Sequence, residues 1–397
     1  MTPLKIVQTP NLNPMKNDQE PSAIASSPDG DPWLFTPGPL TTSPAVKRAM
    51  LHDYGSRDSR FIDINNRIRQ HLTQIVNGQN THVCVPVQGS GTFGVEAMLI
   101  TFIPRSGKVL LLVNGAYGKR MIDICSIHER AYTILETTED LPVNTDELDR
   151  RLAADPDISH VAVVHCETTS GILNPIETVA KVTAEHRRSL LIDAMSSFGV
   201  LPLDACDSPF DAVVASSNKC LQGSPGIGFC ICNIETLKQS SGNSDTLVLD
   251  LYSQWKAMER NGQWRFTPPT HTILALGQAL TEFDAEGGVA GRGRRYRHNC
   301  ETLVSGMRTL GFKTLLPDEL QSPIIVTFLT PADPNFQFDR FYEELRKRGY
   351  IIYPGKLTVS DSFRVGCIGH ISEGQVRGLI DAIRDTLGVM SVSNCGP

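Results

Sequence analysis

The sequence predicts an α/β protein with a large lobe built on a mostly parallel sheet and a smaller C-terminal α+β lobe. Two observations predict this fold. Between about residues 80 and 235, short β-rich apolar runs alternate with amphipathic stretches of helical length. This alternation is typical of a parallel sheet covered by helices on both faces. From about residue 290 onward, longer helices and isolated strands follow one another, as in a small α+β lobe.

The individual elements follow from apolar periodicity. The strands expected in the large lobe are 82–85, 108–113, 131–135, 160–165, 190–193, 212–215 and 228–233. The helices expected between them include 118–127, 144–154 and 175–186. In the small lobe we expect helices at 292–310, 338–348 and 372–387, and strands at 323–329, 350–353 and 362–366.

These patterns divide the chain of 397 residues into three parts. Residues 1–31 are rich in Pro, Asn, Ser and Asp, and we expect a disordered extension there. Residues 32–287 form the predicted large lobe, including an N-terminal segment, and residues 288–390 form the small lobe. The chain is long enough for this division.

Composition excludes several functions. Charged residues make up 20% of the chain and the net charge is −6, so the sequence gives no basic surface for nucleic acid. The densest basic stretch, 291–297, is expected on a solvated helix face. No apolar run is long enough to span a membrane.

The ten cysteines have no metal-ligand spacing, so we expect no metal site. Many sit in apolar runs, which predicts buried thiols in a reducing compartment, the cytoplasm.

A lysine after a short strand is the most informative feature. Strand 212–215 is followed by Ser216, Ser217, Asn218 and Lys219, and then by a loop rich in glycine. A partly desolvated lysine among small polar residues suits covalent bonding to a carbonyl compound. Most lysines beside loops are surface residues, so the neighbouring motifs decide between the two interpretations.

Two such motifs precede the lysine. Strand 190–193 ends in Asp193, which could pair with a protonated ring nitrogen or simply cap a helix. The turn 88–92, which includes Ser90, Gly91 and Thr92, offers backbone amides and hydroxyls to a phosphate at a helix N-terminus. In a parallel sheet these strand ends converge. Together the motifs predict a site for pyridoxal phosphate.

Two further side chains are candidates on position alone. Tyr117 follows the next strand, and it could stack on the cofactor ring or belong to the core. Arg364 lies in a β-rich run of the small lobe, where its guanidinium could hold a substrate carboxylate or form a structural ion pair. Spacing does not choose between these alternatives.

With these residues in view, the chain resembles the fold-type I pyridoxal-phosphate aminotransferases of class V, over about residues 33–388. Its matching motifs lie at 36–42 (TPGPLTT), 88–92 (QGSGT), 114–118 (NGAYG), 165–171 (HCETTSG), 192–199 (IDAMSSFG), 218–223 (NKCLQG), 264–271 (WRFTPPTH) and 353–356 (YPGK). Three segments, 193–199, 250–255 and 264–267, are closer to the branch that uses 2-aminoethylphosphonate than to its alanine–glyoxylate and serine–pyruvate relatives.

The resemblance implies roles for particular residues. Lys219 would bond to the cofactor, Asp193 would pair with the pyridinium, and Tyr117 would stack on its ring. Other residues would contact the cofactor: Ser90, Gly91, Thr92, Thr168, Asn218 and, from a partner subunit, Thr267. Arg364 would hold the carboxylate of pyruvate or alanine. The family's homodimers with shared active sites imply the same for this chain.

One stretch departs from the family pattern. Where an acidic, tryptophan-containing segment is expected, this chain has 52–61 (HDYGSRDSRF), with Arg57 and Arg60. The arginine pair could bind a phosphonate or mark a different amino donor.

Several activities therefore remain in competition. The leading one is transfer of an amino group from 2-aminoethylphosphonate to pyruvate. Alanine–glyoxylate or serine–pyruvate transamination is the nearest rival. A lyase or desulfurase would need an exposed cysteine loop, and none is evident in the sequence. A phosphate-binding regulatory protein without catalysis is disfavoured by Lys219 together with Asp193.

Overall fold

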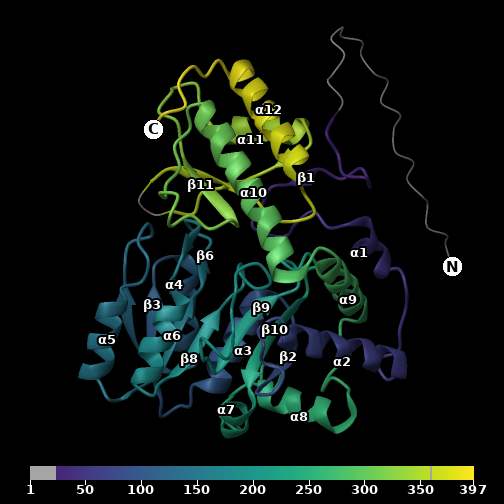
Figure 1. The fold of residues 1–397 in the computed structure, drawn as a ribbon, viewed down its shortest axis with the longest axis vertical. Helices are drawn as coiled ribbons and strands as arrows, with labels where there is room; N and C mark the ends of the chain where they lie inside the picture. Colours follow the sequence, from purple (N-terminus) through teal and green to yellow (C-terminus); the bar gives the residue numbers. More distant parts are fainter. Residues whose placement is uncertain (1–23, 358–359) are drawn as a thin grey trace, which may run out of the picture.

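The computed structural model describes residues 24–357 and 360–397. They form a large α/β lobe and a smaller lobe stacked on it, as Figure 1 shows. Most of the extension expected at 1–31 lies outside the described residues. Residues 24–31 are described, and they contact the small lobe through a hydrogen bond from the Ala25 amide to the Arg348 carbonyl (3.2 Å).

A seven-stranded sheet forms the centre of the large lobe. Its strands, in spatial order, are β2 (His82–Gln88), β10 (Ile227–Asn233), β9 (Ala212–Ser216), β8 (Ser189–Asp193), β5 (Ile158–Val164), β3 (Lys108–Val113) and β4 (Ala131–Glu136). Every neighbouring pair is parallel except the two that involve β10. The predicted mostly parallel sheet is confirmed.

Helices cover both faces of this sheet because its strands are apolar on both sides. Along β3, Leu110 and Leu112 pack into one apolar cluster, while Val109, Leu111 and Val113 pack into the other. The first cluster includes residues of α2 (Ser59–Gln74), α5 (Thr145–Ala154), α6 (Ile176–Glu185) and α9 (Thr270–Ala285). The second includes residues of α3 (Gly91–Phe102), α4 (Ala116–Ile127), α7 (Ile234–Gln239) and α8 (Leu251–Asn261). Such two-sided burial is what a parallel sheet requires.

The small lobe has its own core. A three-stranded antiparallel sheet in the order β11 (Ile325–Leu329), β14 (Ser362–Gly366) and β13 (Tyr353–Pro354) packs with α10 (Gly288–Thr309), α11 (Phe338–Lys347) and α12 (Glu373–Met390). Phe363 lies at the centre of an aromatic cluster, with its ring centroid 5.5–5.6 Å from those of Phe312, Phe328 and Phe341. This packing fixes β14, which carries Arg364.

The N-terminal segment packs on the small lobe. Strand β1 (Trp33–Leu34) pairs in parallel with β12 (Tyr350–Ile351), and Phe35 is buried in the small-lobe core. The chain then descends to α1 (Pro44–Ala49) beside α9, as Figure 1 shows. Residues 33–41 therefore run past the junction of the two lobes.

Helix α10 connects the lobes and corrects one expectation. We expected the basic stretch 291–297 on a solvated face, but Arg292 is only 1% exposed. Its Nη1 donates to the Cys220 carbonyl (2.6 Å), and Tyr296 accepts a hydrogen bond from the Gln222 side chain. The reason is structural: α10 crosses the loop after β9, and two of its side chains hold that loop in place. No helix in the described part of the chain is long and apolar enough to cross a membrane.

Candidate active site

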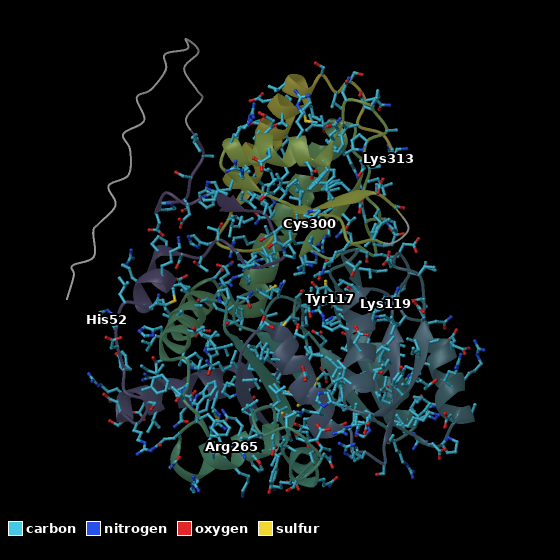
Figure 2. The ribbon with its side chains drawn as sticks, turned by 180° about the vertical axis from the view of Figure 1, so that it is seen from behind. His52, Tyr117, Lys119, Arg265, Cys300 and Lys313 are labelled. Atoms are coloured by element: carbon cyan, nitrogen blue, oxygen red, sulfur yellow. The ribbon has the colours of Figure 1, made fainter. Side chains whose placement is uncertain are left out.

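A cavity of about 360 Å³ opens at the carboxyl ends of the central strands. It is lined by Pro39, Ser90, Gly91, Thr92, Val95, Tyr117, Arg120, Asp193, Met195, Ser216, Asn218, Lys219, Pro225 and Gly226. The residues expected from the turn 88–92 and from strands β3, β8 and β9 thus meet in one place. In Figure 2 the labelled Tyr117 lies where the two lobes meet.

Lys219 reaches this cavity from a tight loop. The loop closes through a hydrogen bond from the Gly223 amide to the Ser217 carbonyl (2.7 Å). Lys219 Nζ donates to the Pro37 carbonyl at 2.6 Å. Burial lowers the pKa of Lys219, because the charged ammonium is poorly solvated there. A larger share of neutral amine at neutral pH makes this lysine a better nucleophile.

Asp193 ends β8 and is 3% exposed. Its Oδ1 accepts a hydrogen bond from the Met195 amide (2.8 Å), and Oδ2 has no hydrogen-bond partner among the described residues. Burial raises the pKa of Asp193 from 3.8 to about 6, even though the Met195 hydrogen bond and the charges of Arg120 and Lys219 lower it. A buried carboxylate with one oxygen free is suited to pair with a cation in the cavity.

The N-terminus of α3 supplies the expected anion site. Its N-cap, Ser90, makes no side-chain capping hydrogen bond, so the first backbone amides of the helix remain available. Arg120 adds a positive charge at the same end, since its Nη1 donates to Thr92 Oγ1 at 3.1 Å. The preceding turn requires glycine: Gly89 has φ +136°, and an added Cβ would lie 2.6 Å from Cγ of Phe93.

These features fit pyridoxal phosphate in three respects. The uncapped helix end and Arg120 suit a phosphate dianion, and the free oxygen of Asp193 suits a protonated ring nitrogen. Ser216 lines the cavity, and its buried Oγ has no hydrogen-bond partner in the described structure. This hydroxyl can therefore hydrogen-bond to a polar group of a bound ligand. The donors and the carboxylate match the polar ends of this cofactor.

Tyr117 is held by Glu167, a residue of the motif 165–171 to which the sequence assigned no role. The N-cap of α4, Gly115, has no side chain, and the buried Glu167 replaces it: its Oε2 accepts from the amides of Tyr117 (3.1 Å) and Gly118 (3.4 Å). Oε1 accepts from the Thr169 amide (3.0 Å) and hydroxyl (2.6 Å). Burial raises the pKa of Glu167 although these hydrogen bonds oppose it. Helix α4 therefore begins at a fixed point beside the cavity.

Several cations act on Tyr117. Burial would raise the pKa of Tyr117, but a hydrogen bond with Thr168 and the charges of Lys219, Lys356 and Arg364 hold it below the ordinary value. Arg364 is 3% exposed, and its Nε and Nη1 donate to the carbonyls of Pro354 (3.1 Å) and Thr168 (2.8 Å). The two lobes thus bring Thr168 and Arg364, both expected at the site, to Tyr117.

Other expected residues lie elsewhere in this chain. Thr267 is exposed and lines a separate cavity of about 410 Å³, which adjoins the turn 88–89. Arg57 and Arg60 do not line the cavity of Lys219. Arg60 is exposed, pairs with Asp58 (2.9 Å) and lies 5.5 Å from the Tyr54 ring centroid.

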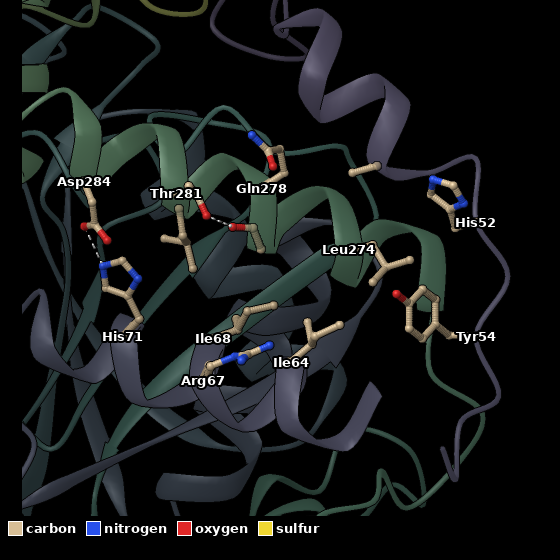
Figure 3. Close-up of a pocket in the computed structure, with 13 residues that line it drawn as sticks. His52, Tyr54, Ile64, Arg67, Ile68, His71, Leu274, Gln278, Thr281 and Asp284 are labelled. Carbon is tan, nitrogen blue, oxygen red and sulfur yellow. Dashed lines mark hydrogen bonds and ion pairs between the residues drawn. The ribbon is translucent and has the colours of Figure 1, made fainter. Parts of the chain in front are cut away.

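The loop of the arginine pair borders a different pocket. Figure 3 shows His52 and Tyr54 beside Leu274 in a pocket of about 460 Å³ between α2 and α9. The structure therefore does not join Arg57 or Arg60 to the Lys219 cavity of the same chain.

The cysteines are consistent with inert thiols. All ten are free, and Cys206 alone is exposed. Burial raises the pKa of Cys220, which follows Lys219, to about 12. A thiol with so high a pKa is a poor nucleophile, so Cys220 does not favour desulfurase chemistry.

Comparison with known proteins identifies the family. The family model for class-V aminotransferases matches residues 43–355. The chain is 54% identical over 361 residues to 2-aminoethylphosphonate–pyruvate transaminase 2 of Burkholderia lata, covering 91% of this chain and 96% of that protein. It is 51% identical over 367 residues to 2-aminoethylphosphonate–pyruvate transaminase of Pseudomonas aeruginosa, covering 92% and 99%.

Solved structures share the fold at lower identity. Pyridoxamine–pyruvate aminotransferase of Mesorhizobium loti superposes with a TM-score of 0.84 at 22% identity, over 93% of this chain and 95% of that one. Ureidoglycine–glyoxylate aminotransferase of Bacillus subtilis gives 0.84 at 20% identity, over 91% and 94%. The expected fold type is confirmed.

Proposed function

Because the chain belongs to the class-V aminotransferase family, whose cofactor is pyridoxal phosphate, we propose that it transfers the amino group of 2-aminoethylphosphonate to pyruvate. The products would be phosphonoacetaldehyde and L-alanine. One observation carries the proposal: a lysine with a lowered pKa and a buried aspartate line the same cavity. The names of relatives that are 54% and 51% identical support the choice of substrates.

Lys219 is the proposed catalytic residue. Pyridoxal phosphate, when bound, supplies an electron sink for the bond that breaks at the amine-bearing carbon of the substrate. Lys219 Nζ is the proposed base that takes the proton from that carbon, because burial lowers its pKa and so favours the neutral amine. The Pro37 carbonyl, 2.6 Å from Nζ, orients the nitrogen.

The remaining residues would hold and orient the cofactor. Ser90, Gly91 and Thr92 are proposed to bind its phosphate at the N-terminus of α3. Asp193 would keep the ring nitrogen protonated, and Tyr117 would stack on the ring. Thr168 and Asn218 would complete the site, because Thr168 hydrogen-bonds with Tyr117 and Asn218 lines the cavity.

Arg364 is proposed to hold the carboxylate of pyruvate or alanine. Its Nε and Nη1 are anchored on backbone carbonyls, and Nη2 has no hydrogen-bond partner among the described residues. Lys219 belongs to the large lobe and Arg364 to the small one. The division into 32–287 and 288–390 is part of this proposal, with residues 33–35 of the first part packed on the small lobe and the substrate bound between the lobes.

A homodimer with shared active sites is also proposed. Thr267 lies outside the cavity of its own chain, and three exposed apolar side chains, Phe93, Val248 and Phe266, line the adjoining cavity. An exposed apolar surface of this kind suits a partner subunit. Thr267 would then reach the cofactor phosphate of that subunit. The ten free cysteines support a reducing compartment, and we propose the cytoplasm.

A panel of amino donors tests the proposed reaction. The purified enzyme, loaded with pyridoxal phosphate, is given pyruvate with 2-aminoethylphosphonate, and L-alanine is measured. The same enzyme is given L-alanine or L-serine with glyoxylate. Turnover of the phosphonate is expected to exceed the other two clearly. Turnover with glyoxylate and none with the phosphonate would assign the alternative activity.

A further inference from the structure

We propose that Lys356 is a substrate-binding residue that selects a dianionic phosphonate over a singly charged group. The inference rests on the proposed function, and it adds a residue to which neither the sequence nor the family comparison assigned a role. Lys356 would contact the second negative charge of 2-aminoethylphosphonate, while Arg364 contacts the first.

Lys356 and Arg364 come from one hairpin. Strand β13 pairs with β14 so that Tyr353 lies opposite Arg364, and the Gly355 amide donates to the Ser362 carbonyl (2.9 Å). Lys356 is the residue after Gly355. The hairpin therefore presents a buried guanidinium and the ammonium of an exposed lysine toward the same tyrosine, Tyr117.

Both cations meet the large lobe at Tyr117. Lys356 Nζ lies 5.2 Å from the centroid of the Tyr117 ring, which lines the cavity. The charge of Arg364 lowers the pKa of the same tyrosine. Arg364 also donates a hydrogen bond to the carbonyl of Thr168, the residue that hydrogen-bonds with Tyr117. Lys356, although its side chain is exposed to solvent, thus has its ammonium at the mouth of the cavity.

The ammonium of Lys356 is available for a ligand. It forms no ion pair with any residue of 24–357 or 360–397, and its contact with the Tyr117 face is a weak attraction that an anion can replace. The buried Glu167, whose charge acts on Arg364, already accepts four hydrogen bonds from Tyr117, Gly118 and Thr169. Among the described residues, the Lys356 ammonium is therefore a positive charge with no carboxylate paired to it.

The two substrates differ in charge and in length, and the unpaired ammonium of Lys356 suits the phosphonate in both respects. A carboxylate carries one negative charge, whereas a phosphonate, like a phosphate ester, carries close to two at neutral pH. The phosphorus of 2-aminoethylphosphonate also lies one carbon–carbon bond farther from the amine-bearing carbon than the carboxylate carbon of alanine does. A second cation beyond Arg364, nearer to solvent, matches both differences.

Taurine provides the matched probe. It has the same chain and a tetrahedral acidic group, but its sulfonate carries one negative charge. The assay measures kcat/KM for 2-aminoethylphosphonate, the KM for pyruvate, and the inhibition constant of taurine as a competitor. These constants are compared in the wild type, Lys356→Ala, Lys356→Arg and the control Lys313→Ala. Lys313 is an exposed lysine of the small lobe well away from Tyr117 (Figure 2).

We expect Lys356→Ala to lower kcat/KM for the phosphonate about tenfold, as for a lost charge-assisted hydrogen bond at a partly solvated site. The inhibition constant of taurine and the KM for pyruvate should change much less. Lys356→Arg should restore most of the phosphonate activity, and Lys313→Ala should match the wild type.

Two results would overturn the inference. One is an equal loss for the phosphonate, taurine and pyruvate, which would show a general effect on the hairpin. The other is no loss at all in Lys356→Ala. In either case the wild type would still turn over the phosphonate, so the proposed function would stand. If the wild type itself failed to use 2-aminoethylphosphonate, the proposed function would fall and this inference with it.

Discussion

Replacing Asp193 with asparagine should change protein stability and catalysis in opposite directions. The substitution keeps the shape of the side chain and the oxygen that accepts from the Met195 amide. It removes a negative charge from a residue that is 3% exposed. In the protein freed of cofactor, that charge has no cation bonded to it, so its loss should stabilise the fold.

The magnitude follows from the pKa. In the fold, burial raises the pKa of Asp193 from 3.8 to about 6. The folded protein therefore binds this proton more tightly than the unfolded chain, and ionised Asp193 lowers the unfolding free energy as pH rises from about 4 to 6. At about 1.4 kcal/mol for each pKa unit, the full cost above pH 6 is about 3 kcal/mol. Asparagine removes this cost, so the variant should gain up to about 3 kcal/mol at pH 8 and little below pH 4.

Catalysis should respond in the opposite sense. With pyridoxal phosphate bound, the variant should remove the substrate proton about 100-fold more slowly in a single turnover, because a neutral ring nitrogen is a poorer electron sink. Asp211→Asn is the matched control: Asp211 also has a pKa raised by burial and accepts from the Leu190 amide (2.9 Å), but it precedes β9 and does not line the cavity. Its rate should be unchanged.

The assays are thermal or denaturant unfolding of the cofactor-free proteins at pH 4.5 and pH 8, and stopped-flow absorbance with the loaded enzyme. A variant that is less stable than the wild type at pH 8, or that keeps the full single-turnover rate, would refute the reasoning. Asp193 would then have a structural role only.

Three further predictions concern the same site. Lys219→Ala should fold but lose the visible absorbance that borohydride bleaches in the loaded wild type, and turnover should fall by several orders of magnitude; turnover near the wild-type rate would contradict the assigned role. Arg364→Ala should raise the KM for pyruvate strongly, because a lost charge-assisted hydrogen bond weakens binding by about 1.5–3 kcal/mol. An unchanged KM would place the carboxylate elsewhere. Glu167→Gln should lower the unfolding free energy by about 1–3 kcal/mol, because its amide group would face backbone donors at the start of α4; unfolding identical to the wild type would exclude this capping role.

The sequence predicted the large lobe well where local signals are strong. The strand expected at 108–113 is β3 (Lys108–Val113), and the strands that end in Asp193 and precede Lys219 lie where alternation placed them. Six of the proposed site residues with local motifs line one cavity: Ser90, Gly91, Thr92, Asn218, Asp193 and Lys219. These residues follow strand ends, and parallel strand ends converge by geometry.

Contacts between segments that are distant along the chain could not be predicted from the sequence. Glu167 was visible only as part of a motif, because its partner amides belong to α4, about fifty residues earlier. The burial of Arg292 was missed for the same reason: a basic stretch looks solvated until the loop of Cys220 is packed against it. Arg120 could have been found, since it lies one helical turn after Tyr117 on the same face.

The small lobe shows the same limit. Its helices and strands followed from periodicity, but the pairing of β1 with β12 joins residues more than three hundred positions apart. Placing Trp33 and Phe35 in the small-lobe core requires the folded chain, since local apolarity does not identify the partner. The position of Lys356 over Tyr117 likewise depends on how the lobes dock.

The most direct test separates the two halves of the reaction. The loaded enzyme is mixed with 2-aminoethylphosphonate without pyruvate, and the aldehyde formed is counted against active sites; pyruvate is then added alone. The account predicts one equivalent of phosphonoacetaldehyde with loss of the visible absorbance, and then one equivalent of L-alanine with its return. Product formation only when both substrates are present together, or no aldehyde from the phosphonate, would contradict it.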